Sequence, residues 1–266
     1  MPELPPISLV HWTGAEAFGV TVGVTTRRGG SSIGPYESLN LGLHVGDDAE
    51  TVIRNRATAA DAFGVALDSW VVARQVHGVA SAVVGPAHRG RGTRSENDAI
   101  TSTDILVTRS PDVTLAILVA DCVPLALVDP EVGVLAAIHA GWRGTAAGAV
   151  GRALSAMRAC GAEPRRVRAF LGPAVERGRY QVTDEVRRAL TEAVLPADLD
   201  GAVARPDGPG HFLVDLIAAN RQQLVAHGVP NEHIVDSGIT TAHADFFSDR
   251  AQRPCGRFAL LARLTA

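Results

Sequence analysis

The chain has few cysteines, and this limits how its fold can be held together. Cys122, Cys160 and Cys255 are the three cysteines in 266 residues, and an odd, scattered set excludes a disulfide framework. Such sparse usage is typical of a reducing compartment, where a lone cysteine remains available as a thiolate ligand or a nucleophile. We therefore expect a cytoplasmic protein.

Long apolar runs and a large excess of one charge are also lacking. The apolar stretches fall short of the roughly 18 residues typical of a membrane span. Residues 1–6 show no basic region followed by an apolar core, so no signal peptide is expected. A formal net charge of -3 gives no general attraction to nucleic acid or anionic membranes. We expect neither as a partner, and the sequence leaves the oligomeric state open.

The chain does have enough apolar sequence for a full core. Its hydrophobic fraction of 46% is ordinary for a folded chain, and the length suffices to bury a core without staples. No repeat, long linker or change of composition divides the chain. The sequence therefore predicts one α/β (α+β) domain over residues 1–266, with residues 1–19 as a peripheral N-terminal segment.

Short apolar runs that lie close together predict mixed, partly antiparallel β-sheets packed with helices, including hairpins among the runs between residues 104 and 139. The expected strands cover residues 20–26, 70–77, 104–109, 115–119, 124–128, 132–139, 167–171, 234–236 and 257–262. The expected helices cover residues 48–63, 144–159, 183–194 and 214–226. Glycine-rich residues 85–98 are interpreted as a solvated surface loop, with a mobile lid or anion-binding loop as the functional alternative.

One cysteine and two histidines stand at the ends of predicted strands. Cys122 and His139 close an apolar block, and His77 ends a strand whose alternation places it on one face with Gln75. Zinc enzymes commonly use three imidazole or thiolate ligands and leave a fourth position open. The spacing of these residues matches no local metal motif. A zinc site is therefore one interpretation, beside a buried cysteine and two hydrogen-bonded histidines.

A cysteine hydrolase is the other functional interpretation of these residues. Cys122 would be the nucleophile, a histidine its base, and Asp121 or Asp129 the carboxylate that orients the histidine. Spacing along the sequence does not separate a catalytic triad from a metal site. From the residues alone both interpretations stay open.

Several blocks resemble the YfiH-type family, whose members are described as laccase-domain or polyphenol oxidase proteins and as purine nucleoside phosphorylases. The most specific blocks are Gln-Val-His at 75–77, Ala-Asp-Cys-Val-Pro at 120–124 and Ile-His-Ala-Gly-Trp-Arg-Gly-Thr at 138–145. Weaker matches extend the resemblance from about residue 25 to 257. It implies an α/β fold with mixed sheets and a metal, zinc with copper as the alternative, held by His77, Cys122 and His139.

The resemblance also implies an activity. This is phosphorolysis of adenosine, inosine and guanosine to the base and ribose 1-phosphate, with adenosine deamination and methylthioadenosine cleavage as companions. Copper-dependent phenol oxidation and hydrolysis of a peptidoglycan precursor through Cys122 are the alternatives. Nine scattered histidines without a His-x-His pair argue against a site for several coppers. Relatives often carry Cys-Cys-Tyr at 178–180 and histidine at Asp249, and these two departures bear on substrate preference.

The remaining candidates are expected around the metal. Asp121 is the candidate acid, with a structural role as its alternative. Phosphate or ribose would be held by Arg27, Arg56 and Arg143, for which ion-paired or surface arginines are the alternative. His44 and Gln75 are expected in the same pocket, and Phe247 would stack on a purine unless it belongs to the core.

Overall fold

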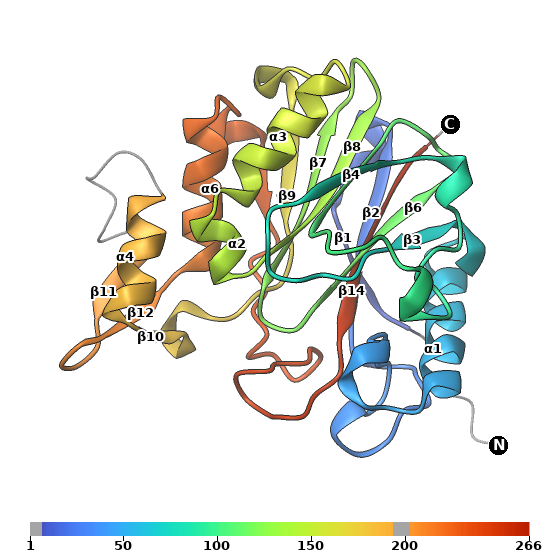
Figure 1. Cartoon of the computed structure of the whole chain (residues 1–266), viewed down its shortest axis with the longest axis horizontal. Helices are drawn as coiled ribbons and strands as arrows, with labels where there is room; N and C mark the ends of the chain where they lie inside the picture. The colour runs from blue at the N-terminus through green and yellow to red at the C-terminus, as the bar shows by residue number, and fades with distance from the viewer. Residues whose placement is uncertain (1–6, 194–202, 266) are drawn as a thin grey trace.

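Two β-sheets packed face to face form the centre of the molecule, in a computed structural model that describes residues 7–193 and 203–265 (Figure 1). The five-stranded sheet has the order β1 (Leu9–His11), β2 (Val20–Thr25), β14 (Phe258–Leu264), β6 (Thr114–Val119), β3 (Trp70–Val72). The six-stranded sheet has the order β13 (Ile234–Asp236), β9 (Arg168–Leu171), β7 (Val123–Asp129), β8 (Val134–Ala140), β5 (Ile105–Thr108), β4 (Ser81–Val84).

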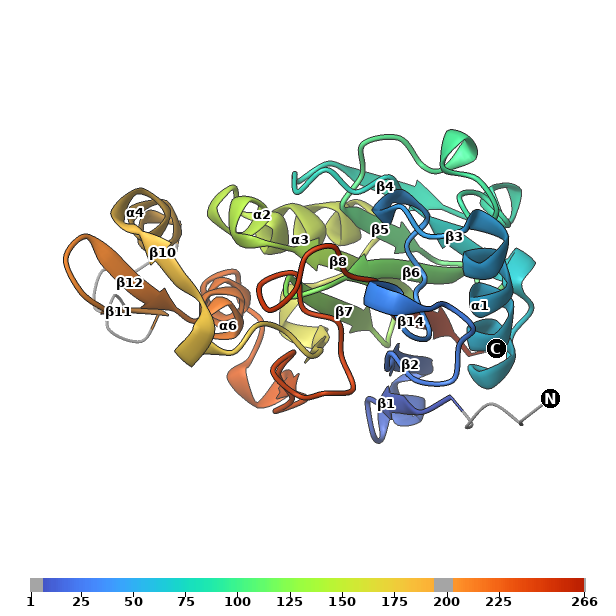
Figure 2. The same ribbon diagram turned by 90° about the horizontal axis from the view of Figure 1, so that it is seen from below.

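Helices cover the outer faces of both sheets, so the fold has the layers helix, sheet, sheet, helix (Figure 2). On one side α1 (Ala49–Ala62) packs on the five-stranded sheet. On the other side α3 (Ala149–Ala159) and α6 (Leu216–Ala226) pack on the six-stranded sheet. A small sheet of β10 (Gln181–Thr183), β12 (His211–Val214) and β11 (Ala204–Pro206) lies beside α4 (Asp184–Glu192), at one end of the molecule.

The continuous apolar runs of the sequence follow from this layering. In β7, Leu125 and Leu127 face the helices, whereas Ala126 and Val128 face the other sheet. A strand that is covered on both faces needs apolar residues at every position rather than at every second one. The same alternation in β8 places His139 on the face of Leu135, toward the other sheet.

Pairing of β7 with β8 brings distant positions together. The two strands form an antiparallel hairpin in which Pro124 pairs with His139 and Val123 with Ala140. Because the start of one strand meets the end of the next, Cys122, just before β7, and His139, near the end of β8, share one edge of the sheet. This edge carries the candidate site.

The predicted fold class is confirmed: the chain is a single α+β domain with mixed sheets and packed helices. Most predicted elements lie where expected, within a few residues at their ends. The expectation of hairpins holds for β7 and β8, but β6 joins the other sheet and pairs with β3 and with β14 near the C-terminus. The N-terminal segment, predicted to be peripheral, supplies edge strand β1 and also buries the Trp12 ring.

Two predicted elements end earlier or break. The strand predicted over 70–77 was wrong beyond Val72, because the backbone leaves the sheet after one bridge from Ala73 to Ile100. The helix predicted over 144–159 is two helices, α2 (Trp142–Ala146) and α3, separated at Gly148, whose φ of 80° lies in the left-handed region. The last residue of the helix predicted over 183–194 lies outside the described residues.

Among residues 7–193 and 203–265, no helix has the length and apolar character needed to cross a lipid bilayer.

Candidate metal centre and its pocket

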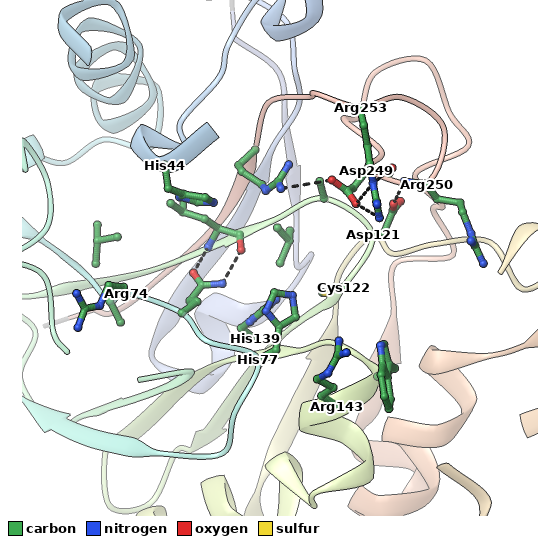
Figure 3. Close-up of a pocket in the computed structure, with 18 of the residues that line it drawn as sticks. His44, Arg74, His77, Asp121, Cys122, His139, Arg143, Asp249, Arg250 and Arg253 are labelled. Carbon is green, nitrogen blue, oxygen red and sulfur yellow. Dashed lines mark hydrogen bonds and ion pairs between the residues drawn. The ribbon is translucent and has the colours of Figure 1, made fainter. Parts of the chain in front are cut away.

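Three side chains predicted as metal ligands meet at one edge of the six-stranded sheet (Figure 3). The ligand atoms of His77, Cys122 and His139 all lie within 4.8 Å of one another. The two imidazole rings stand edge to face, with centroids 4.7 Å apart. Burial rises from the exposed His77 through Cys122 to the buried His139, so the cluster opens on one side. Two nitrogens and one sulfur with an open side form the donor set of a metal site.

His77 reaches the cluster from a loop rather than from a strand end. Its backbone adopts a φ of 60°, in the left-handed region that non-glycine residues rarely occupy. The carboxylate of Asp104 accepts hydrogen bonds from the backbone N–H groups of Val76, His77 and Gly78. The loop is thus fixed by a side chain that our sequence analysis did not single out.

Asp104 also contacts the second histidine. Its Oδ1 lies 2.8 Å from Nδ1 of His139, and its backbone carbonyl accepts from the His139 N–H. The sequence offers Asp121 or Asp129 as the carboxylate that orients a histidine, and neither lies there: Asp129 pairs with Arg166, and Asp121 accepts from Thr241 and Arg250. The signal for Asp104 was its place just before β5, the strand that pairs with β8.

The cluster favours a thiolate. Burial opposes ionisation of Cys122, but the positive charge of His139 and hydrogen bonds from both histidines outweigh it and lower the Cys122 pKa to about 6. Burial likewise opposes protonation of His139, whereas Cys122 and Asp104 raise its pKa to about 9. A thiolate beside two imidazoles attracts a divalent ion of intermediate softness, so the residues fit a metal.

Gly141 keeps space free beside the cluster. A Cβ atom at this position would lie 2.7 Å from Sγ of Cys122 and 3.0 Å from Cδ2 of His77. The contact with Sγ is shorter than Cβ atoms make in folded proteins, so any larger residue would displace Cys122. The glycine of the His-Ala-Gly-Trp-Arg-Gly block therefore has a steric role at the site.

A cavity of about 710 Å³ opens above the cluster. This volume lies within the roughly 300–1,000 Å³ typical of small-molecule sites. The cavity is bordered by the ends of β3 and β6, the start of α2, the small sheet and the loop before β14. Because the chain contains no lysine, its lining cations besides histidine are all arginines: Arg56, Arg74, Arg143, Arg250, Arg253 and Arg257.

Asp121, the candidate acid, has both carboxylate oxygens engaged. One accepts from the Thr241 hydroxyl at 2.5 Å and the other from the Arg250 backbone N–H at 2.6 Å. Its φ of 88° turns the chain just before Cys122. In Figure 3 the side chain lies beside Asp249 and Arg250, on the loop side of the cavity. The carboxylate therefore anchors that loop.

Arg56 and Gln75 line the cavity, but their polar groups serve the backbone. The fully buried Arg56 guanidinium donates to the carbonyls of Leu41, Gly92 and Thr93. The Gln75 amide donates to the Leu118 carbonyl and accepts from its N–H, which continues the pairing beyond β3. Arg56 thereby holds the centre of the glycine-rich 85–98 loop against the core.

Arg27 and Phe247 lie apart from the cavity lining. The Arg27 guanidinium stacks over the Phe247 ring, 4.5 Å from its centroid, and donates to the Glu37 carbonyl. Phe247 is 1% exposed and belongs to the core between the sheets. The structure brings neither of them to the cluster of His77, Cys122 and His139.

His44 and Arg143 do line the cavity. A Glu96 carboxylate lies 3.5 Å from Nδ1 of His44, yet burial and the charges of Arg257 and Arg56 prevail and lower the His44 pKa to about 4. The Arg143 guanidinium stacks 4.3 Å from the centre of the Trp142 ring. Both side chains keep exposed surface toward the cavity.

Further lining residues, which were not named as site candidates from the sequence, come from residues 180–186 and 249–257. Arg250 stacks over the Tyr180 ring, and its guanidinium donates to the Gln181 carbonyl. Asp249 pairs with Arg253 at 2.6 Å and with Arg257 at 3.6 Å. Tyr180 and Asp249 are adjacent to, or part of, the two places where the chain departs from the resemblance. Those departures were the feature of the sequence from which these lining residues could have been found.

The fold and the cluster together define a class: an α+β domain with a cysteine–histidine metal-type site beneath a small-molecule cavity. The model of the family described as "Multi-copper polyphenol oxidoreductase laccase" matches residues 21–265, and the chain belongs to this family. The family membership that the sequence resemblance predicted is thereby confirmed.

Characterised relatives match over most of their length. The chain is 40% identical over 259 residues to "Purine nucleoside phosphorylase YlmD" of Geobacillus stearothermophilus, covering 95% of this chain and 94% of that one. It is 38% identical over 239 residues to "Adenosine deaminase RL5" of an unknown prokaryotic organism, covering 89% and 88%. The family thus includes proteins named for two reactions of purine nucleosides.

Solved structures agree with the fold. The Bacillus licheniformis protein YfiH superposes with a TM-score of 0.92 at 35% identity, covering 98% of this chain and 97% of that one. YlmD from Geobacillus stearothermophilus superposes with a TM-score of 0.89 at 38% identity, covering 93% of each chain.

Proposed function

We propose that the chain is a zinc-dependent purine nucleoside phosphorylase that cleaves adenosine, inosine and guanosine. The observation that carries the proposal is the cluster of His77, Cys122 and His139 beneath a cavity of about 710 Å³ lined by arginines. Relatives named purine nucleoside phosphorylase support the reaction class. Adenosine deamination is proposed as a companion activity from the relative named for it, and methylthioadenosine cleavage from the resemblance alone.

In the proposed reaction a phosphate oxygen forms a bond to C1′ of the ribose as the bond from C1′ to N9 breaks. The bonding electron pair goes to the purine, which takes up a proton, and the products are the free base and ribose 1-phosphate. His77, Cys122 and His139 would hold the zinc, which would supply a Lewis acid to this reaction. The charge that phosphate carries and the charge that develops on the leaving base both need fixed donors.

The chain's own side chains supply these donors. Guanidinium groups stay charged and bind phosphate oxygens in pairs, and Arg143, Arg250 and Arg253 offer exposed ones at the cavity. Burial raises the pKa of the Tyr180 hydroxyl, so it remains a hydrogen-bond donor at neutral pH. Trp142 and Tyr180, rather than Phe247, are the aromatic side chains available to a purine at the cavity.

Purified protein tests this proposal directly. Inosine, guanosine and adenosine are incubated with and without phosphate, and then with a chelator, while metal content is measured by elemental analysis. We expect about one zinc per chain, release of base that requires phosphate, and loss of turnover after metal removal. Turnover that ignores both phosphate and chelation would contradict the proposal.

A cysteine hydrolase is the second candidate, and a specific observation favours it. Cys122, His139 and Asp104 form a hydrogen-bonded series in the order of nucleophile, base and orienting carboxylate. This arrangement assigns no catalytic role to His77, whereas a metal site uses His77, Cys122 and His139 as ligands. A muropeptide assay in the presence of chelator separates the candidates, because the hydrolase would keep its activity.

Copper chemistry has weaker support. Among the described residues, His77, Cys122 and His139 are the one group of three or more metal-ligating side chains that lie together. Oxidases with several coppers need more ligands than one such group provides. A phenol-oxidation assay with copper-loaded protein would test for this activity.

A further inference from the structure

Asp104 is a fully buried carboxylate that pairs with a histidine rather than an arginine among the described residues. Its exposed fraction is 0%, and within the described part of the chain its ion-pair partner is His139. Four N–H groups converge on it: three consecutive backbone donors of residues 76–78 and Nδ1 of His139. Burying a carboxylate is costly unless its acceptor sites are filled, as they are here.

The ring contact fixes the tautomer of His139. An ionised carboxylate has acceptors only, so the 2.8 Å contact from Oδ1 to Nδ1 requires the proton to be on Nδ1. In the neutral ring that binds a metal, Nε2 then carries the free electron pair that the ion needs. Asp104 thus determines which nitrogen of His139 can bind an ion.

The backbone contacts fix the other histidine. His77 holds a left-handed backbone in a segment without strand partners, and its own N–H lies 3.0 Å from Oδ1 of Asp104. The next N–H, at Gly78, lies 2.8 Å from Oδ2. One carboxylate therefore binds the main chain of one candidate ligand and the ring of another.

We infer that Asp104 is the positioning residue of the metal centre: it sets the tautomer of His139 and holds the loop that carries His77. The inference rests on the proposed metal-dependent function. It predicts that the charge and both oxygens of Asp104 are needed for metal affinity, although the side chain does not reach the cavity. Carboxylates that hydrogen-bond ligating histidines typically contribute about 10–100-fold to metal affinity.

Asp104→Asn is the sharpest test, because it keeps the shape and replaces one oxygen by NH2. If the amide nitrogen faces His139, it donates to Nδ1 and forces the ring proton onto Nε2, which then cannot bind metal. If it faces Gly78, two N–H groups oppose each other. Either orientation disturbs a ligand.

Asp129→Asn is a matched control. Asp129 is also 0% exposed and also accepts from backbone N–H groups, but it ends β7, whose other end adjoins Cys122. Its substitution removes buried hydrogen bonds far from the metal. Urea unfolding of the metal-free variants reports how much stability each loses.

The measurements are zinc affinity by chelator competition and the visible spectrum of the cobalt-substituted protein. We expect Asp104→Asn to weaken zinc binding about 10–100-fold and to change the cobalt bands. Asp129→Asn should stay within about twofold of wild type, the scatter expected for an uncoupled site. Affinity and spectrum of Asp104→Asn equal to wild type would overturn the inference.

Two further outcomes keep the test decisive. If wild-type protein binds neither zinc nor cobalt, the proposed metal-dependent function fails, and this inference with it. If Asp104→Asn does not fold, ring ¹⁵N spectra of zinc-loaded wild type decide instead. A proton on Nδ1 of His139 supports the inference, and a proton on Nε2 overturns it.

Discussion

The floor and one rim of the cavity are built in opposite ways. The floor, formed by His77, Cys122 and His139, stands at the edge of a sheet covered on both faces, with Asp104 beneath it. The rim, formed by residues 249–257, is a loop with exposed side chains that Asp121 anchors from below. Each region depends on one buried carboxylate. Rigid support suits the proposed metal site, whereas a loop allows the proposed substrate contacts to vary.

The largest expected effect breaks the floor. Cys122→Ser should lose zinc and lower phosphorolysis of inosine by on the order of 10³, since several kcal/mol of charge stabilisation depend on the metal. Cys160→Ser, which lies beyond the end of α3 and away from the cluster, is the matched control and should keep both. Full zinc content in Cys122→Ser would contradict a metal site at the cavity floor.

Substitution of Arg56 tests whether a residue that lines the cavity stabilises the fold rather than binds substrate. Arg56→Ala leaves the carbonyls of Leu41, Gly92 and Thr93 without their donor, so the free energy of unfolding should fall by roughly 2–4 kcal/mol. Arg54→Ala, on the exposed face of the same helix, should change it by less than about 0.5 kcal/mol. Urea denaturation measures both. If Arg56→Ala kept its stability but failed to bind phosphate, Arg56 would be a phosphate-binding residue rather than a structural one.

Asp121 separates loop anchoring from acid catalysis. Asp121→Asn tolerates the left-handed backbone but weakens the contacts to Thr241 and Arg250, each about 1 kcal/mol. The KM for nucleoside or phosphate should rise roughly tenfold, with kcat within about threefold and zinc retained. Steady-state kinetics provide the measurement. A kcat reduced by orders of magnitude with unchanged KM would instead identify Asp121 as the acid.

The smallest expected effect concerns His44 on the cavity wall. Because its pKa falls from the ordinary 6.5 to about 4, the folded chain binds fewer protons than the unfolded chain between these values. Acidification through that window therefore lowers stability, weakly since the side chain is half exposed. His44→Gln should lose less stability than wild type between pH 6.5 and 4.5 in urea unfolding. Equal losses would show that burial and the neighbouring arginines do not lower the His44 pKa in the folded chain.

The sequence predicted the parts of this molecule that depend on local pattern. Continuous apolar runs predicted β7 and β8. Cys122 and His139 were predicted as site residues because they stand at the two ends of this apolar block. The alternation of side chains over residues 70–77 led to a strand prediction that is too long, because the segment leaves the sheet after Val72. His77 is positioned by Asp104 rather than by a strand. The rim was missed since Arg250 and Arg253 reach the cavity from a loop, where no period relates sequence to direction.

The hydrogen bonds beneath His77 also determine how slowly this loop exchanges its amide protons with solvent. No strand of residues 7–193 and 203–265 pairs with residues 76–78, yet their N–H groups point at a carboxylate with no exposed surface. We expect such protons to exchange slowly, because their acceptor stands just before β5, the strand that pairs with β8. Fraying of surface loops would then leave the cluster intact, and its geometry would persist until the sheet itself unfolds.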